Sequence, residues 1–168
     1  MKNYSSSSSF AFFESILLST MVLGIGITLS NSTEIIEVQA VIIAVSIILS
    51  LLIILYQRKR VFEIQFKDEF IEIVFIYTKR KLQVPYSELL TVEYISVYKN
   101  PTKNKIEFKL DKKRKKLKFL TVANSNEYVE FIKWLKSKNE NIEWRVFPSD
   151  NFMNHKLQEI YGFKYRKN

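Results

Sequence analysis

The sequence has no cysteine and only one histidine, His155, among its 168 residues. Without cysteine the chain can form no disulfide, no thiolate nucleophile and no cysteine-ligated zinc site. A single histidine also excludes metal sites that are built from several histidines. Glycine is scarce: three occur, two of them in the first apolar run, so there is no glycine-rich loop to hold a phosphate. We expect no catalytic residue, no metal and no cofactor.

Charge is nearly missing from the first third of the chain. Residues 1–56 hold one of the 26 basic residues and three of the 17 acidic ones, which leaves 25 basic and 14 acidic residues, a net charge of +11, on residues 57–168. A domain this basic attracts anionic lipid headgroups, nucleic acid or acidic protein surfaces. A solvated surface with no specific partner is the alternative. Nucleic acid is disfavoured, because the aromatic residues alternate like an inward-facing core rather than an open stacking face.

Two long apolar runs fill the uncharged part. Residues 38–56 contain nineteen residues without a charge, which as a helix would reach about 28 Å, close to the hydrocarbon thickness of a bilayer. Residues 10–29 form a second run that only Glu14 interrupts. A single lysine ahead of it and the lack of a cleavage pattern argue against a signal peptide. We predict a flexible tail at residues 1–9 and a transmembrane hairpin at 10–56, with spans at about 10–29 and 36–56.

Basic residues near the ends of the spans set the expected orientation. The turn between the spans has none, whereas residues 58–60 are all basic and follow the second span directly. The positive-inside rule therefore predicts a multi-pass protein of the plasma (inner) membrane with both termini cytoplasmic. The first expected strand starts at the membrane, so on a simple up-and-down path of strands the turn at residues 79–81 lies on the membrane side as well. The expected membrane-interface residues are Tyr56, Arg58, Lys59, Arg60, Lys79, Arg80 and Lys81.

Small residues predict how the two spans pack. Helices in lipid associate through small side chains spaced four residues apart. Packing of the two spans against each other explains such stripes, and association with a neighbouring copy is the alternative. The stripes are Thr20, Gly24 and Thr28 in the first span, and Ala40 with Ala44 and Ser46 with Ser50 in the second.

Glu14 is the only charged residue inside either apolar run. A carboxylate at membrane depth is a candidate functional group. Its position in the second helical turn, near the cytoplasmic face, favours a role as an anchor or as an ion-pair partner of Arg58 over a role in proton transfer.

Apolar periodicity changes to two directly after the basic residues. Phe62, Ile64 and Phe66 alternate with polar residues, which is typical of a strand. Asn124, with Glu127 three residues later, is typical of the start of a helix, which we expect to end near Ser137. This order predicts an α+β fold, a bent antiparallel sheet or partly closed barrel with a helix over one end. Five further strands are expected at about 70–77, 82–84, 91–98, 106–110 and 116–122.

A short motif, Val84-Pro85-Tyr86-Ser87-Glu88-Leu89, follows the third expected strand. With two spans before it and more strands and one helix after it, the chain resembles the bacterial pleckstrin-homology-like (PH-like) membrane proteins, in which an I/V-P-Y/W-S-x-I/L step occupies this place. The resemblance covers about residues 61–138 and, by architecture, the hairpin. It implies a cytoplasmic PH-like domain at 57–138 that acts as a non-enzymatic adaptor or scaffold and often self-associates.

The chain departs from that fold in two ways. Six strands are expected before the helix, where the fold has seven. Residues 140–168 have no counterpart in the basic fold. We assign residues 139–168 to a C-terminal extension with a strand near Ile142–Val146 and a short helix at about 151–161.

The densest positive charge lies at the expected tip of a β-hairpin. On a simple up-and-down path of strands this turn points away from the bilayer, while Lys103 points towards it. A solvated hairpin, membrane contact and binding of another anionic partner all remain open as interpretations. The run comprises Lys112, Lys113, Arg114, Lys115 and Lys116, followed by Lys118.

Together these features predict a non-enzymatic adaptor or scaffold, anchored in the membrane, that binds lipid headgroups or a protein partner at the cytoplasmic face and self-associates. The alternative function is an accessory subunit of a membrane transport or channel assembly, with Glu14 facing a partner.

Overall fold

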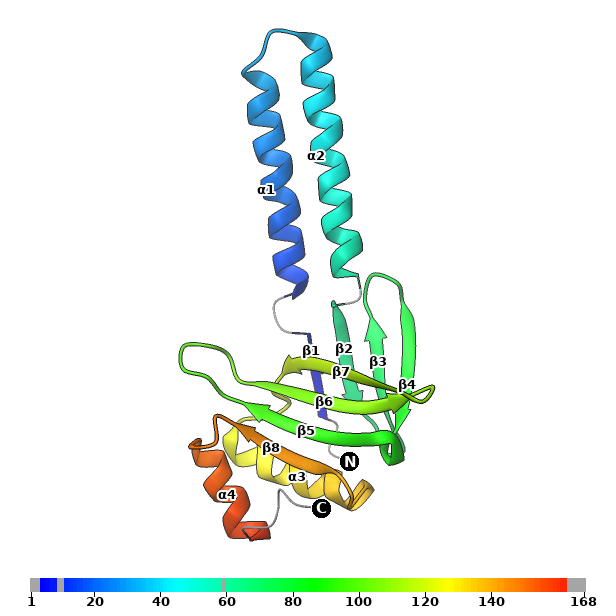
Figure 1. Ribbon diagram of the computed structural model, residues 1–168, viewed down its shortest axis with the longest axis vertical. Coiled ribbons are helices and arrows are strands. Elements are labelled where there is room, and N and C mark those ends of the chain that lie inside the picture. Colours follow the sequence, from blue (N-terminus) through cyan, green and yellow to red (C-terminus); the bar gives the residue numbers. More distant parts are fainter. Residues whose placement is uncertain (1–3, 9–10, 59, 163–168) are drawn as a thin grey trace. The chain divides into compact units, whose positions relative to one another are not determined.

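The computed structural model describes residues 4–8, 11–58 and 60–162 (Figure 1). The chain divides into two compact units. The hairpin unit contains residues 10–62 and 75–79, and the sheet unit contains residues 1–9, 63–74 and 80–168. The α+β class expected from the sequence is confirmed: two long apolar helices near the N-terminus are followed by two β-sheets and by further helices.

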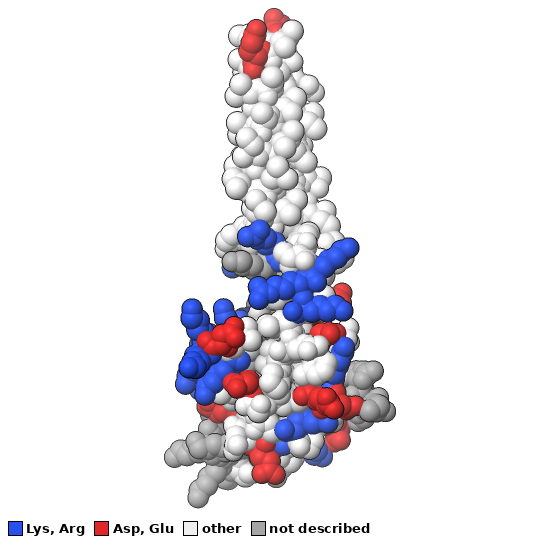
Figure 2. All heavy atoms as spheres, turned by 90° about the vertical axis from the view of Figure 1, so that its right-hand side faces the viewer, with Lys and Arg blue, Asp and Glu red and all other residues white. Residues whose placement is uncertain are grey.

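The hairpin unit is built on α1 (Ala11–Asn31) and α2 (Ile36–Gln57), close to the two spans expected from the sequence. With 21 and 22 residues, each reaches roughly 30 Å. A core helix of a soluble protein buries its apolar side chains, whereas most of the large apolar side chains of α1 and α2 are exposed. On the face drawn in Figure 2, the only charged side chains along the helices are acidic ones at the end where the loop joins them. Both helices are thus compatible with membrane insertion.

Serine and glycine form the contact between the two helices. Ser19 of α1 and Ser46 and Ser50 of α2 are buried, and Ser50 Oγ donates a hydrogen bond to the Ser19 carbonyl oxygen at 3.3 Å. A Cβ atom on Gly26 would lie 2.6 Å from Ser46 Cβ, so a larger residue would prevent this close approach. The role expected of Ser46 and Ser50 is confirmed.

The small-residue stripe expected on the first span does not pack against the second span, and its association with a neighbouring copy stays a prediction. Thr20, Gly24 and Thr28 are exposed on α1, as are Ala40 and Ala44 on α2. The stripe that packs instead uses serine, whose hydroxyl can bond back to its own helix and then occupies little more space than a methyl group. Ser46 does this, donating to the carbonyl oxygen of the residue four positions earlier at 2.9 Å.

A turn of the β-region also belongs to the hairpin unit. Tyr77 Oη lies 2.6 Å from Ser15 Oγ, and the Tyr77 ring centroid lies 6.1 Å from that of Phe12. The Ile76 N–H donates to the Val61 carbonyl oxygen at 3.1 Å. Residues 75–79 therefore pack where α1 begins and α2 has ended.

The first sheet has the strand order β1-β2-β3-β4. The expected alternation is confirmed in β2, where Phe62, Ile64 and Phe66 are buried. After β4, a single 3₁₀ turn at Tyr86–Glu88 leads into the second sheet. The four strands are β1 (Tyr4–Ser7), β2 (Phe62–Phe66), β3 (Phe70–Phe75) and β4 (Arg80–Pro85).

Strand β1 corrects the expectation of a flexible N-terminal tail; the rest of that segment, residues 1–3 and 9, lies outside the described residues. Tyr4 to Ser7 pair antiparallel with β2, with Tyr4 opposite Phe66 and Ser7 opposite Glu63. Ser6 Oγ also donates to the Leu120 carbonyl oxygen at 2.6 Å. A run of serines carries no apolar alternation, and its partner strand lies more than fifty residues away, so local pattern does not predict this pairing.

The second sheet has the order β7-β6-β5-β8, in which β8 runs parallel to β5 and the other pairs are antiparallel. The strands form two four-stranded sheets and not a closed barrel. Part of the expected C-terminal extension, β8, thus lies in the second sheet. Its strands are β5 (Leu89–Ile95), β6 (Lys103–Leu110), β7 (Lys113–Leu120) and β8 (Glu143–Phe147).

Helix α3 (Ser125–Lys138) covers the inner face of the second sheet. It begins where expected, since the Asn124 side chain accepts hydrogen bonds from the N–H groups of Asn126 and Glu127. Tyr128 is fully buried; its hydroxyl accepts a 2.6 Å hydrogen bond from Asn104 Nδ2, and its ring lies 4.7 Å from the Tyr94 ring. A last helix, α4 (Phe152–Tyr161), ends at Gly162, which has a φ of 76°.

Candidate anionic-partner surface

The β6–β7 hairpin carries the densest positive charge of the protein. Residues 103–120 contain nine basic and two acidic residues, a net charge of +7, against +9 for the whole chain. In β6, Ile106 and Phe108 are buried, and the residues that alternate with them, Lys105, Glu107 and Lys109, point to the outer face of the second sheet. Alternation in a single strand therefore places its lysines on one side.

A two-residue turn joins the strands of this hairpin. Leu110 pairs with Lys113, and the residues between them, Asp111 and Lys112, have φ angles of 50° and 63°. Two positive φ values in succession are characteristic of the type I′ turn that suits the twist of a hairpin. Because neither residue is glycine, this turn is strained.

The expectation that the whole basic run forms a hairpin tip is wrong. Only Lys112 lies in the turn, and Lys113 begins β7. The run is therefore divided between two faces: Arg114, Lys116 and Lys118 share the outer face with Glu107 and Lys105, whereas the alternate residues, Lys113 and Lys115, follow the inner face. The part of an edge strand that extends beyond the core has no buried residue at alternate positions. Its sequence therefore lacks the apolar alternation that predicts a strand and is predicted to be a loop.

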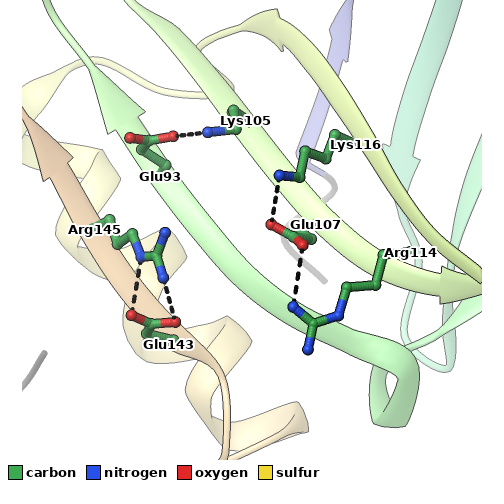
Figure 3. Close-up of polar contacts among 7 residues, drawn as sticks. All are labelled: Glu93, Lys105, Glu107, Arg114, Lys116, Glu143 and Arg145. Carbon is green, nitrogen blue, oxygen red and sulfur yellow. Dashed lines mark hydrogen bonds and ion pairs between the residues drawn. The ribbon is translucent and has the colours of Figure 1, made fainter. Parts of the chain in front are cut away.

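Four basic side chains of the outer face are engaged by carboxylates (Figure 3). Glu107 lies 3.5 Å from Lys116 Nζ and 3.8 Å from an Arg114 nitrogen, and Glu93 pairs with Lys105. Arg145 donates two hydrogen bonds to Glu143, both of 2.9 Å, and this bonding raises the pKa of the guanidinium. These pairs are solvent-exposed in part and stabilise the fold by less than about 1 kcal/mol each.

The remaining lysines of the hairpin have no such neighbour. None of them forms an ion pair with a residue that the structure describes. Strand β7 is also the edge of its sheet, and charged side chains on an edge strand oppose pairing with another chain. The unpaired lysines on β7 can therefore protect the edge, and all six unpaired lysines of the hairpin can attract anions. They are Lys103, Lys109, Lys112, Lys113, Lys115 and Lys118.

The residues expected at the membrane interface are only partly brought together. Tyr56 is exposed at the end of α2, with the Arg60 guanidinium 4.9 Å from its ring centroid, and the Arg58 N–H caps the helix by donating to Ile54. Lys79 lies in the turn that belongs to the hairpin unit. Lys59 lies outside the described residues. Arg80 and Lys81 belong to β4 rather than to the expected turn at 79–81.

Glu14 is exposed in the first turn of α1. The ion pair expected with Arg58 is not formed, and Glu14 pairs with no other residue in the described part of the chain. Its role stays a prediction.

The sequence motif of the PH-like resemblance has a structural place. Pro85 ends β4, and the next residue, Tyr86, is buried with its ring 5.7 Å from that of Trp134. The Tyr86 hydroxyl donates to the Lys67 carbonyl oxygen at 2.6 Å, and burial raises the pKa of the phenol. The motif thus joins the two sheets around an aromatic side chain in the core.

The sequence interpretation missed most of the outer face. Lys105, Lys109 and Arg145 join the basic run there, and Ile95 and Phe147 are register partners at one end of the face. The apolar alternation of β6 could have predicted that its lysines lie on one face of the sheet, together with the basic residues of β7. The parallel pairing of β8 has no local signal.

Among the described residues no group of three histidine, cysteine or acidic side chains could hold a metal ion. No protein-family model matches the chain, and no curated protein sequence matches it either.

Proposed function

We propose that this protein is a membrane-anchored, non-enzymatic adaptor. Its helical hairpin spans the bilayer with both ends on the cytoplasmic side, and a PH-like domain presents the β6–β7 hairpin to an anionic partner, either lipid headgroups or an acidic protein surface. The observation that carries the proposal is the +7 charge of residues 103–120, with six lysines that lack a carboxylate partner within the described chain.

The pairing of β1 with β2 supports the proposed topology. These strands precede and follow the two helices, yet they share one sheet. Two spans between them return the chain to the side from which it started. Arg58 and Arg60 after α2, against a loop with no basic residue, favour the cytoplasm for that side.

The same strand supports the PH-like assignment. With β1 counted, seven strands precede α3 in the described part of the chain, which is the number in the PH-like fold and one more than the sequence indicated. The transmembrane hairpin would then be an insertion between the first and second strands, and β8 and α4 would be additions to the basic fold.

The adaptor proposal is tested with the full-length protein in nanodiscs of neutral phosphatidylcholine. A fragment that starts at residue 57 would lack β1 and is not a suitable substitute. The probes are vesicles with 30% phosphatidylglycerol and fluorescent polyglutamate, at low and at physiological salt. We expect binding of at least one probe, weakened by salt.

Two variants with four glutamines each make the test specific. Both lose four positive charges, so a difference between them in probe binding shows that the position of the charges on the β6–β7 hairpin matters, and not only their number. We expect binding to be lost in the hairpin variant and kept in the control. Absence of binding to both probes, or equal loss in the two variants, rejects the proposal. The hairpin variant changes Lys109, Lys112, Lys113 and Lys115, and the control changes Lys133, Lys136 and Lys138 of α3 and Lys156 of α4.

A further inference from the structure

One end of the second sheet exposes apolar side chains that the fold does not use. Ile95 and Phe147 are register partners on the outer face, and the Ser96 N–H donates to the Phe147 carbonyl oxygen at 2.9 Å. The chain then enters the β5–β6 loop with Val97 and Tyr98. The exposed fractions of Val97, Tyr98 and Phe147 are 40, 86 and 54%. Figure 1 shows this loop projecting beyond the strands that it joins.

Lysines surround this apolar end. Lys103 is the register partner of Ile95, and Lys118 lies one row further along the same face, opposite Lys105. Lys99 Nζ lies 5.5 Å from the Tyr98 ring centroid. The turn at Asp111–Lys112 lies at the other end of the hairpin, about 25 Å away along eight-residue strands. The apolar end is therefore distinct from the dense run of lysines.

We propose that this apolar end is a bilayer-contact surface: Val97, Tyr98 and Phe147 enter the interface of the chain's own anionic membrane, and Lys99, Lys103 and Lys118 contact its headgroups. The proposal rests on the membrane anchoring in the proposed function, and it does not depend on the partner of Lys112–Lys116. Tyrosine is suited to this position, because its ring is apolar and its hydroxyl stays hydrated.

The charged groups favour a lipid surface over a discrete anionic ligand. Arginine binds a single phosphate or carboxylate with two parallel hydrogen bonds, whereas lysine acts as a mobile point charge. Both arginines of the outer face, Arg114 and Arg145, are already engaged by glutamates of the same sheet. The basic groups left free at this end are lysines, which suit the diffuse charge of an anionic leaflet.

The transmembrane anchor keeps the sheet unit close to the membrane surface, so the effective concentration of lipid headgroups around it is high. Only residues 58–61 separate α2 from β2, a span of at most about 18 Å when extended. A surface tethered this closely needs little intrinsic affinity to stay bound. A few exposed apolar and basic residues are therefore sufficient.

The chain has no cysteine, so a single one can carry a fluorophore. The experiment uses the full-length protein with Val97→Cys labelled with an environment-sensitive dye, which leaves Tyr98 in place. The matched control is Ser137→Cys, which is exposed on α3, the helix on the opposite face of the sheet. Both are reconstituted in nanodiscs of phosphatidylcholine alone or with 30% phosphatidylglycerol, and quenching by acrylamide is measured.

We expect the dye at Val97 to shift to the blue and to be protected from acrylamide in anionic nanodiscs, while the dye at Ser137 stays accessible. Changing Lys99, Lys103 and Lys118 to glutamine should lower the ratio of docked to free domain about 100-fold. Tyr98→Ser should lower protection as well. An unchanged unfolding midpoint shows that both variants keep the fold.

Equal quenching of the two dyes in anionic nanodiscs overturns the inference. Protection that persists in neutral nanodiscs and rises with protein concentration also overturns it, in favour of contact between copies. If vesicle or polyglutamate binding through Lys109, Lys112, Lys113 and Lys115 persists in either case, the adaptor proposal stands while the bilayer contact fails.

Discussion

Replacing Tyr4 by alanine removes the one aromatic side chain that ties the N-terminal strand to the core. The Tyr4 ring centroid lies 4.8 Å from that of Phe131 and 5.4 Å from that of Trp134, and the residue is 9% exposed. Deletion of a buried aromatic side chain costs about 3–5 kcal/mol, and we take the lower figure because β1 lies at a sheet edge. A loss of about 3 kcal/mol is a large share of the roughly 5–15 kcal/mol that stabilises a domain.

The assay is urea unfolding of the full-length protein in detergent micelles, followed by tryptophan fluorescence. Trp134 adjoins Tyr4, so the signal reports the region of the change. Tyr4→Phe keeps the ring and should stay within about 1 kcal/mol of wild type. Ser5→Ala, at an exposed position of the same strand, should have no effect.

A Tyr4→Ala variant that unfolds within about 0.5 kcal/mol of wild type would refute the reasoning, because a surface change has an effect of that size. The N-terminal residues would then be a tail after all. The seventh strand, and with it the structural support for the PH-like assignment, would be lost.

Four further changes have defined outcomes. Lys112→Gly should stabilise the protein by about 1 kcal/mol in the same urea assay, since glycine adopts the positive φ of 63° without strain. Gly26→Ala should separate α1 from α2 in spin-label distance measurements, whereas Gly24→Ala, with nothing within 4 Å of the added Cβ, should not. Burial raises the pKa of Tyr128 above its ordinary 10.0, so the stability that the neutral phenol supports is complete below pH 10.0 and falls above it; the fall should be smaller in Tyr128→Phe, where buried Tyr86, whose pKa is also raised, still contributes. Glu14→Gln should leave anionic-vesicle binding intact, and loss of function in cells would instead favour a transport subunit.

Local patterns identify the elements whose signals lie within one segment. Apolar runs as long as a bilayer is thick identify α1 and α2, because length and composition alone decide whether a helix can span a membrane. Asn124 marks the start of α3 through a cap that involves only the next three residues. Alternation finds β2 and β6, each of which has one buried face.

The same reasoning fails where the partner decides the structure. Lys113 to Lys115 look like a loop because the core does not extend beneath them, yet pairing with β6 makes them a strand. The composition of the outer face, including Arg145 and Phe147, depends on the parallel register between β5 and β8. Thr20 and Ser19 are both small residues, and only the packed helices show which of them faces α2.

By itself, the sequence determined that the chain has two membrane-length helices, a basic β-rich domain and no cysteine, because composition and short periodicity express these properties directly. The tertiary structure decided that β1 completes the first sheet across the intervening helices. It also decided that the basic run is an edge strand and that lysines and exposed apolar side chains meet at one end of a sheet face. Each of these features is a contact between segments distant in the sequence, and such contacts are set by packing and register rather than by local pattern.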